Sequence, residues 1–266
     1  MFPYFVVFGK TIGMYALCSG VGLILAAAFF ALQVKRIGIK FEDVVLMVLV
    51  VLAGIMVGGH FLFGVTQFES LVVIFKHIGK LPFMDTVRLI VECFGGSVFY
   101  GGLIGSCLAG LIYMRIKKYS LQERQVCADT YACAIPLFHT FGRIGCFFGG
   151  CCYGIESKFG FTAHGNTYSP AVNDVNRFPV ALLEASLDLI LFFVLFAIYK
   201  KGKLKGNLIF TYGLAYSVIR FSTEFLRGDV IRGIWFGLST SQWISIVLFV
   251  VCVTKLIRLK YVKQTA

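Results

Sequence analysis

Three arginines and a glutamate stand in or just beyond segments that are otherwise apolar. Arg220 and Glu224 are four residues apart, Arg227 follows three residues later and Tyr216 comes four before Arg220. A helix would carry all four on one face. An arginine and a glutamate one turn apart can pair, which fixes the guanidinium and leaves N–H donors for an anion. Arg143 adds a second cation in another apolar segment. The pattern favours an anion-binding site, and an ion pair that only satisfies itself is the alternative.

Glycines gather around Arg143 and in a second cluster upstream. The run that begins at Gly142 and ends at Gly154 surrounds Arg143, and such a run lets the backbone approach a ligand closely. The upstream cluster includes Gly101 and Gly102. Small residues also let membrane helices pack closely, so this second cluster fits either helix packing or a binding site.

Three cysteines lie inside the same glycine run, at Cys146, Cys151 and Cys152. A structural zinc site usually shows two pairs, or a cysteine–histidine combination at short spacing, and no second pair follows here. The spacing therefore predicts no metal. A disulfide between Cys146 and Cys151, a catalytic thiol and plain buried packing remain open alternatives.

The segments that hold these residues are long and apolar. The chain has 266 residues, 58% of them hydrophobic and 14% charged, with a mean hydropathy of +0.85. This composition excludes a soluble oxidoreductase, a disordered linker and a secreted disulfide-rich module, and the low charge density argues against nucleic-acid binding. Continuously apolar runs of about 20 residues indicate membrane-spanning helices. We expect an all-α, multi-pass fold with spans at residues 11–32, 44–66, 93–114, 127–150, 179–199, 206–226 and 238–256.

Basic side chains set the expected orientation of these seven spans. Lysines and arginines gather in alternate connections, and such residues accumulate on the cytoplasmic side of a membrane. The N-terminus is therefore expected outside and the C-terminus in the cytoplasm. The first segment lacks a basic leader, so we expect a span there rather than a cleavable signal. No internal repeat divides the sequence, which predicts a single domain over residues 1–266.

With this orientation the charges inside the spans fall at one depth. Arg143, Glu184 and Arg220 each lie within about seven residues, or about 10 Å, of the outer end of their span. Charged groups inside a span usually face a protein-lined or wet site, and at outer-leaflet depth the available anion is a phospholipid phosphate. A transporter would need a polar path through both leaflets, whereas the inner halves of these spans are almost purely apolar.

Four motifs occur in order along the chain. They are S-V-F-Y-G-G-L-I-G at Ser97–Gly105, G-R-I-G-C-F-F-G-G-C-C-Y-G at Gly142–Gly154, R-F-P-V-A-L-L-E at Arg177–Glu184, and the spaced residues of Tyr216–Arg227. These motifs resemble segments of the prolipoprotein diacylglyceryl transferase family, namely F-H-G-G-L-I-G, G-R-I-G-N-F-x-N-x-E-x-x-G, R-H-P-x-Q-L-Y-E and Y-x-x-x-R-x-x-x-E-x-x-R. Gln242 matches a glutamine that precedes the last span in that family.

The resemblance implies a transferase in the cytoplasmic (inner) membrane of a bacterium. Its donor would be phosphatidylglycerol, a membrane lipid, and its acceptor the lipobox cysteine in the signal peptide of a preprolipoprotein. The products would be a diacylglyceryl thioether and glycerol phosphate, and no cofactor is needed.

The same resemblance implies roles for individual residues. Arg143 and Arg220 would hold the phosphate and stabilise charge that develops on the leaving group. Glu224 would orient Arg220, and Arg227 would guide the headgroup. Tyr100 is the remaining catalytic candidate. The remaining candidates for contact with the substrate are Gly101, Gly102, Gly142, Cys146, Gly154, Glu184 and Tyr216.

Three positions depart from the family pattern. Tyr100 stands where the family has histidine, Cys146 where it has asparagine and Cys151 where it has glutamate. Tyrosine has an ordinary pKa of about 10 and is a poor general base at neutral pH. Tyr100 would then hydrogen-bond the substrate, while the leaving phosphate or Glu224 takes the thiol proton. A related transferase with a different acceptor, in which the cysteines have a new role, is the alternative.

Overall fold

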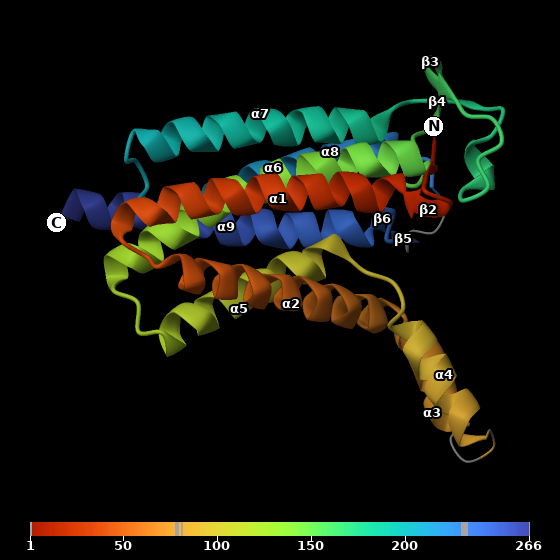
Figure 1. The fold of residues 1–266 in the computed structure, drawn as a ribbon, viewed down its shortest axis with the longest axis horizontal. Helices are drawn as coiled ribbons and strands as arrows, with labels where there is room; N and C mark the ends of the chain where they lie inside the picture. Colours follow the sequence, from red (N-terminus) through yellow and green to blue (C-terminus); the bar gives the residue numbers. More distant parts are fainter. Residues whose placement is uncertain (1, 78–79, 81, 230–233, 266) are drawn as a thin grey trace. The chain divides into compact units, whose positions relative to one another are not determined.

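The protein is mostly helical. The computed structural model describes residues 2–77, 80, 82–229 and 234–265 (Figure 1). Within them the long helices are α1 (Met14–Val34), α2 (Phe41–Thr66), α5 (Phe99–Ile116), α6 (Leu121–Gly149), α7 (Val180–Lys200), α8 (Leu208–Thr223) and α9 (Thr240–Thr265). Each overlaps one of the expected spans.

Five helical segments of the described chain are long and apolar enough to cross a membrane, at residues 14–37, 41–66, 99–116, 180–200 and 240–259. This makes the chain a multi-pass membrane protein. The other two long helices, α6 and α8, carry most of the polar residues singled out above, and α8 has only 16 residues. Seven crossings and the orientation of the termini stay predictions.

Several of the expected spans have different ends in the structure: α6 begins six residues earlier than expected and α9 continues to Thr265, and two further differences affect the site. The third was expected from residue 93, but Cys93 ends a separate helix, α4 (Phe83–Cys93), and α5 begins only at Phe99. The intervening Gly95 and Gly96 favour a break in the helix. The sixth was expected to continue to residue 226, but α8 stops at Thr223 and a tighter turn follows.

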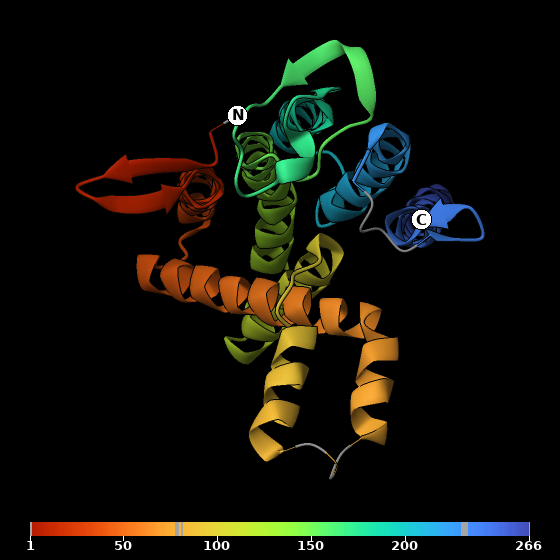
Figure 2. The same cartoon turned by 90° about the vertical axis from the view of Figure 1, so that its right-hand side faces the viewer.

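The chain divides into two compact units, residues 1–37 with 122–266, and residues 38–121. In the first unit α1, α6, α7, α8 and α9 run alongside one another (Figures 1 and 2). The contacts of α8 are made mainly with α9 and α7. The single domain expected over the whole chain stays a prediction.

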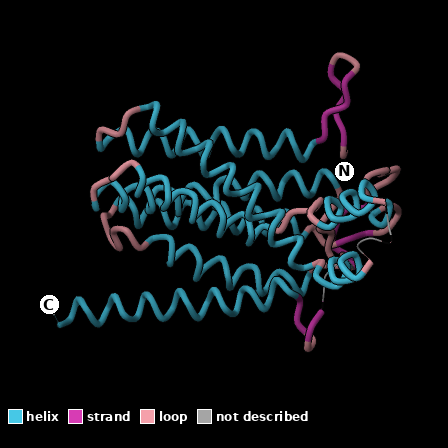
Figure 3. The backbone as a smooth tube through the Cα atoms, turned by 90° about the horizontal axis from the view of Figure 1, so that it is seen from below, coloured by secondary structure: helices cyan, strands magenta, loops and turns pink. Residues whose placement is uncertain are grey.

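Short strand pairs correct the all-α expectation. The first unit has three antiparallel pairs at the same end of its helices (Figure 3). They are β1 (Tyr4–Val7) with β2 (Lys10–Gly13), β3 (Glu156–Thr162) with β4 (Asn176–Arg177), and β5 (Ile234–Trp235) with β6 (Leu238–Ser239). The long connection after α6 is therefore ordered. Asn166, only 2% exposed, donates from Nδ2 to the carbonyl of Gly149 (3.1 Å), which ties this connection to the end of α6.

Side chains cap two of the helices in the first unit. Asp129 of α6 accepts hydrogen bonds from the backbone N–H of Gly206 (2.6 Å), which precedes α8, and from that of Leu208 (3.0 Å), the first residue of α8, whose N–H has no partner within the helix. At the start of α9, Gln242 Oε1 accepts from the N–H of Ser239 (2.9 Å) and Ser239 Oγ accepts from the N–H of Gln242 (3.2 Å). This reciprocal pair is a capping box. The caps fix where α8 begins relative to α6.

In the second unit, α2 and α5 pack through glycine backbones. A Cβ on Gly58 would lie 2.2 Å from the carbonyl oxygen of Gly101. A Cβ on Gly101 would lie 2.3 Å from the carbonyl oxygen of Gly58. Gly102 faces Ile55, whose Cγ2 would be 3.2 Å from an added Cβ. Helix packing therefore accounts for both glycines, and their predicted contact with substrate stays a prediction. The connection from α2 to α5 forms α3 (Phe68–Lys76) and α4, which lie side by side in Figure 2.

We predict that Gly58→Ala destabilises the protein by about 1–3 kcal/mol, because the added methyl group meets backbone that has no room to move. Gly20→Ala is the matched control, since a Cβ at Gly20 of α1 meets nothing within 4 Å and alanine favours a helix. Thermal unfolding of the purified protein in detergent measures both. Equal shifts in the two variants would contradict the packing assigned to α2 and α5.

Candidate active site

A buried carboxylate joins three helices of the first unit. Glu184 lies near the start of α7, and its Oε2 is 2.6 Å from Nε of Arg143 on α6. Its Oε1 is 2.8 Å from Nη1 of Arg220 on α8. The three side chains belong to residues only 3%, 7% and 6% exposed, respectively. The three charged side chains that the sequence places at one depth are therefore in contact, and Glu184 positions both arginines.

Arg220 is held at both of its terminal nitrogens. The pair predicted from the spacing forms, with Nη2 2.7 Å from Oε2 of Glu224. Nη2 also donates to Oγ of Ser241 at 3.4 Å. Thr223 Oγ1 donates to Glu184 at 3.0 Å and so fixes the carboxylate from the same helix as Arg220. These bonds immobilise the Arg220 guanidinium.

Arg143 is held at Nε alone. Besides Glu184, its Nε donates to Nε2 of His139 at 3.1 Å, and Nδ1 of that histidine is 2.9 Å from Oδ2 of Asp188. The two terminal amino groups of Arg143 donate no hydrogen bond to another residue in the part of the chain that the structure describes. Their N–H donors are available to an anion.

Asp188 is the residue of this network that sequence reasoning missed. It lies one turn after Glu184 on α7 and is 0% exposed. A second carboxylate at this spacing in an apolar span is a signal that the sequence does contain. His139 connects these residues, since its ring contacts Asp188 through Nδ1 and Arg143 through Nε2.

Arg227 does not share the helical face expected for it. The backbone turns after Leu226, and Arg227 is extended, with φ −85° and ψ 138°. Its guanidinium pairs with Asp229 through Nε (2.9 Å) and Nη2 (2.5 Å). Its backbone forms an antiparallel bridge with Gly154, where a Cβ would lie 2.2 Å from the carbonyl oxygen of Phe178. Gly154 is thus required by close backbone packing.

The other predicted contacts occupy different surroundings. Tyr216 is 2% exposed, stacks on Tyr212 at 5.6 Å and meets the ring of His139 edge-on at 5.4 Å. A Cβ on Gly142 would meet no described atom within 4 Å, so there is open space at this position beside Arg143. In the second unit, Tyr100 is 4% exposed and lies in the first turn of α5.

The three cysteines of the glycine run come together at the C-terminal end of α6. Their Sγ atoms all lie within 4.8 Å of one another. Hydrogen bonds with Cys146 and Cys151 hold the pKa of Cys152 well below its usual range against the effect of burial, and the charges of Arg227 and Arg143 lower this pKa further. The cluster is a feature that the spacing of the cysteines did not predict.

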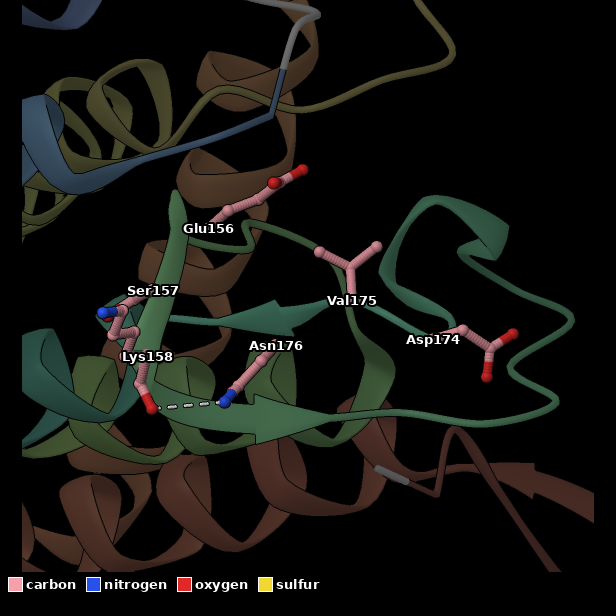
Figure 4. Close-up of a pocket in the computed structure, with 6 residues that line it drawn as sticks. All are labelled: Glu156, Ser157, Lys158, Asp174, Val175 and Asn176. Carbon is pink, nitrogen blue, oxygen red and sulfur yellow. Dashed lines mark hydrogen bonds between the residues drawn. The ribbon is translucent and has the colours of Figure 1, made fainter.

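A surface hollow in the same unit lies apart from this chemistry. It is lined by Glu156, Ser157, Lys158, Asp174, Val175 and Asn176, and Asn176 Nδ2 donates to the carbonyl of Lys158 at 3.3 Å (Figure 4). None of these six residues takes part in the arginine network described above.

Comparison with known proteins finds one family over nearly the whole chain. The family profile described as prolipoprotein diacylglyceryl transferase matches residues 3–258. The phosphatidylglycerol–prolipoprotein diacylglyceryl transferase 2 of Clostridium perfringens is 33% identical over 249 residues, which cover 92% of this chain and 90% of that protein. The phosphatidylglycerol–prolipoprotein diacylglyceryl transferase of Campylobacter hominis is 30% identical over 268 residues, or 98% of this chain and 91% of that protein. The transferase of the same name from Clostridium tetani is 27% identical over 247 residues, or 93% of each chain.

We predict that Glu184→Gln destabilises the protein by about 3–5 kcal/mol, because two buried guanidinium groups then lose their shared counter-charge. The exposed Glu156→Gln is the control. The double variant Arg143→Gln with Glu184→Gln should be less destabilised than the sum of its single variants, since one unpaired charge is removed with its partner. Unfolding in detergent measures all four proteins, and strict additivity would show that the two residues do not interact.

Proposed function

Because the chain belongs to the prolipoprotein diacylglyceryl transferase family, we propose that it transfers the diacylglyceryl group of phosphatidylglycerol to the lipobox cysteine of preprolipoproteins. A multi-pass membrane protein suits a lipid donor and an acceptor that carries a hydrophobic signal peptide. The protein would act in the bacterial cytoplasmic membrane, with seven crossings, its N-terminus outside and its C-terminus in the cytoplasm.

The reaction displaces a phosphate from carbon. The acceptor sulfur forms a bond to the terminal glyceryl carbon of the diacylglyceryl group, while the bond between that carbon and the phosphate oxygen breaks and its electrons stay with glycerol phosphate. The phosphodiester becomes a monoester, so negative charge grows on the leaving group. Fixed cations aimed at that charge stabilise the transition state.

The observation that carries the proposal is the state of Arg143. Nε of this guanidinium is anchored by Glu184 and His139, while its terminal amino groups donate no hydrogen bond to the residues that the structure describes. Such a fork matches two oxygens of a phosphate.

Arg220 and Glu224 would act beside this fork. Arg220 is immobilised by Glu184, Glu224 and Ser241, so its charge stays fixed while the leaving group develops. Glu224 holds Arg220 and would accept the thiol proton if glycerol phosphate does not. Tyr100 would hydrogen-bond the substrate, and Arg227 would guide the headgroup.

A second candidate is a transferase that uses the same phospholipid but a different acceptor. The observation in its favour is that cysteines occupy two positions of the signature motif, Cys146 and Cys151. Both candidates share the phosphate-binding role of Arg143, and they differ in which molecule supplies the nucleophile.

We predict that the purified protein converts a lipobox peptide to a diacylglyceryl thioether in phosphatidylglycerol micelles, and that Arg143→Gln lowers the rate by at least about 100-fold. Arg36→Gln, an exposed change outside the network, should leave the rate unchanged. Mass spectrometry of the peptide and detection of glycerol phosphate measure the reaction. Release of glycerol phosphate without a peptide product would favour the second candidate, and a fully active Arg143→Gln variant would contradict the phosphate role.

We predict further that Tyr100→Phe lowers turnover by about 10-fold, the effect of losing one hydrogen bond to the substrate. Tyr113→Phe removes a hydroxyl from the same helix, where the hydroxyl donates to Asp43, and serves as the control for loss of stability. The peptide assay with matched amounts of folded protein separates the two effects. Unchanged turnover in Tyr100→Phe would restrict Tyr100 to a packing role.

A further inference from the structure

The cysteine cluster outside the arginine network has the geometry of a thiolate metal site. Cys146 lies in the last turn of α6, and Cys151 and Cys152 follow directly after the helix. Their sulfurs lie within 4.8 Å of one another. Thiolates bound to one Zn²⁺ at about 2.3 Å stand about 3.8 Å apart in a tetrahedral site. Small side-chain rotations would therefore bring the three sulfurs to bonding distance of one ion.

The backbone between these residues is built to turn the chain back on the helix. Gly150 has φ +76°, and a Cβ there would lie 2.5 Å from Nδ2 of the buried Asn166. Cys152 itself has φ +54°, a conformation that costs energy in a residue with a Cβ and persists where surrounding structure enforces it. Asn166 helps to hold this conformation, because its side chain donates a hydrogen bond to the carbonyl of Gly149.

Space and charge around the sulfurs suit a bound cation with one further ligand. A cavity of about 10 Å³ is lined by Cys151 and Cys152 together with Tyr153 and Arg177, among others, and holds about one water molecule. The guanidinium groups of Arg143 and Arg227 interact electrostatically with Cys152. Three thiolates and Zn²⁺ carry one net negative charge, and these guanidinium groups would offset it.

We propose that Cys146, Cys151 and Cys152 bind a thiophilic divalent cation, Zn²⁺, through three thiolates, with the fourth position open to water in the adjoining cavity. Three protein ligands and an open position are the arrangement in which zinc activates a bound water or accepts an exchangeable ligand such as an incoming thiol. The proposal rests on the positions of the sulfurs and does not depend on the transfer reaction.

The test uses the full-length protein in detergent, reduced with a phosphine that does not bind zinc tightly, incubated with Zn²⁺ alone and then desalted. We expect about one Zn²⁺ per chain by elemental mass spectrometry. Replacing Zn²⁺ by Cd²⁺ should produce the ultraviolet absorption of sulfur-to-metal charge transfer. Cys152→Ser should weaken Zn²⁺ binding by at least about 100-fold, since loss of a direct ligand exceeds the effect of losing a second-shell partner.

The matched control removes three cysteines outside the cluster, in the variant Cys107→Ala, Cys127→Ala, Cys133→Ala, and should retain the metal. Far-ultraviolet circular dichroism and size-exclusion profiles confirm that each variant is folded. The proposal is overturned if the reduced protein binds no Zn²⁺, if Cys152→Ser binds as tightly as the parent, or if the control variant loses the metal.

Discussion

The structure of the first unit depends on one buried carboxylate. Glu184 contacts Arg143 and Arg220 at the same time, so it neutralises cations from two helices and joins both to its own. Removing charged groups from water is costly unless they are paired with good geometry. The two arginines can therefore stand in apolar segments only because α7 brings this carboxylate between them.

Much of this arrangement could be predicted from the sequence. Apolar runs located all the long helices, because a membrane span needs about 20 apolar residues. Helical periodicity predicted the pair of Arg220 and Glu224, which lies within one turn. Periodicity could not give the ends of α5 and α8, since these depend on Gly95 and on the tighter turn that places Arg227 off the helix. A contact within a helix follows from spacing, whereas a helix end depends on local backbone.

Contacts between helices could not be predicted from the sequence. The bond of Glu184 to Arg143 joins different helices, and no spacing rule predicts such a pair. Asp188 was missed for the same reason, since its partner His139 lies on α6. The cysteines were judged by their spacing, and the turn at Gly150 brings their sulfurs together without a second pair. The upstream glycines fitted both packing and binding, and only the position of Gly58 showed that Gly101 is needed for packing.

The cap that α6 places on α8 has a mechanical consequence. Both helices end on the side of the site, so they run parallel, and Asp129 ties them at one end while Glu184 ties Arg143 to Arg220 near the other. Because α6 and α8 are held together near both ends, these contacts resist sliding of one helix along the other. A slide of one residue, about 1.5 Å, would break both ties together. The two contacts therefore oppose any slide of α6 along α8 that would change the separation of the Arg143 and Arg220 guanidinium groups.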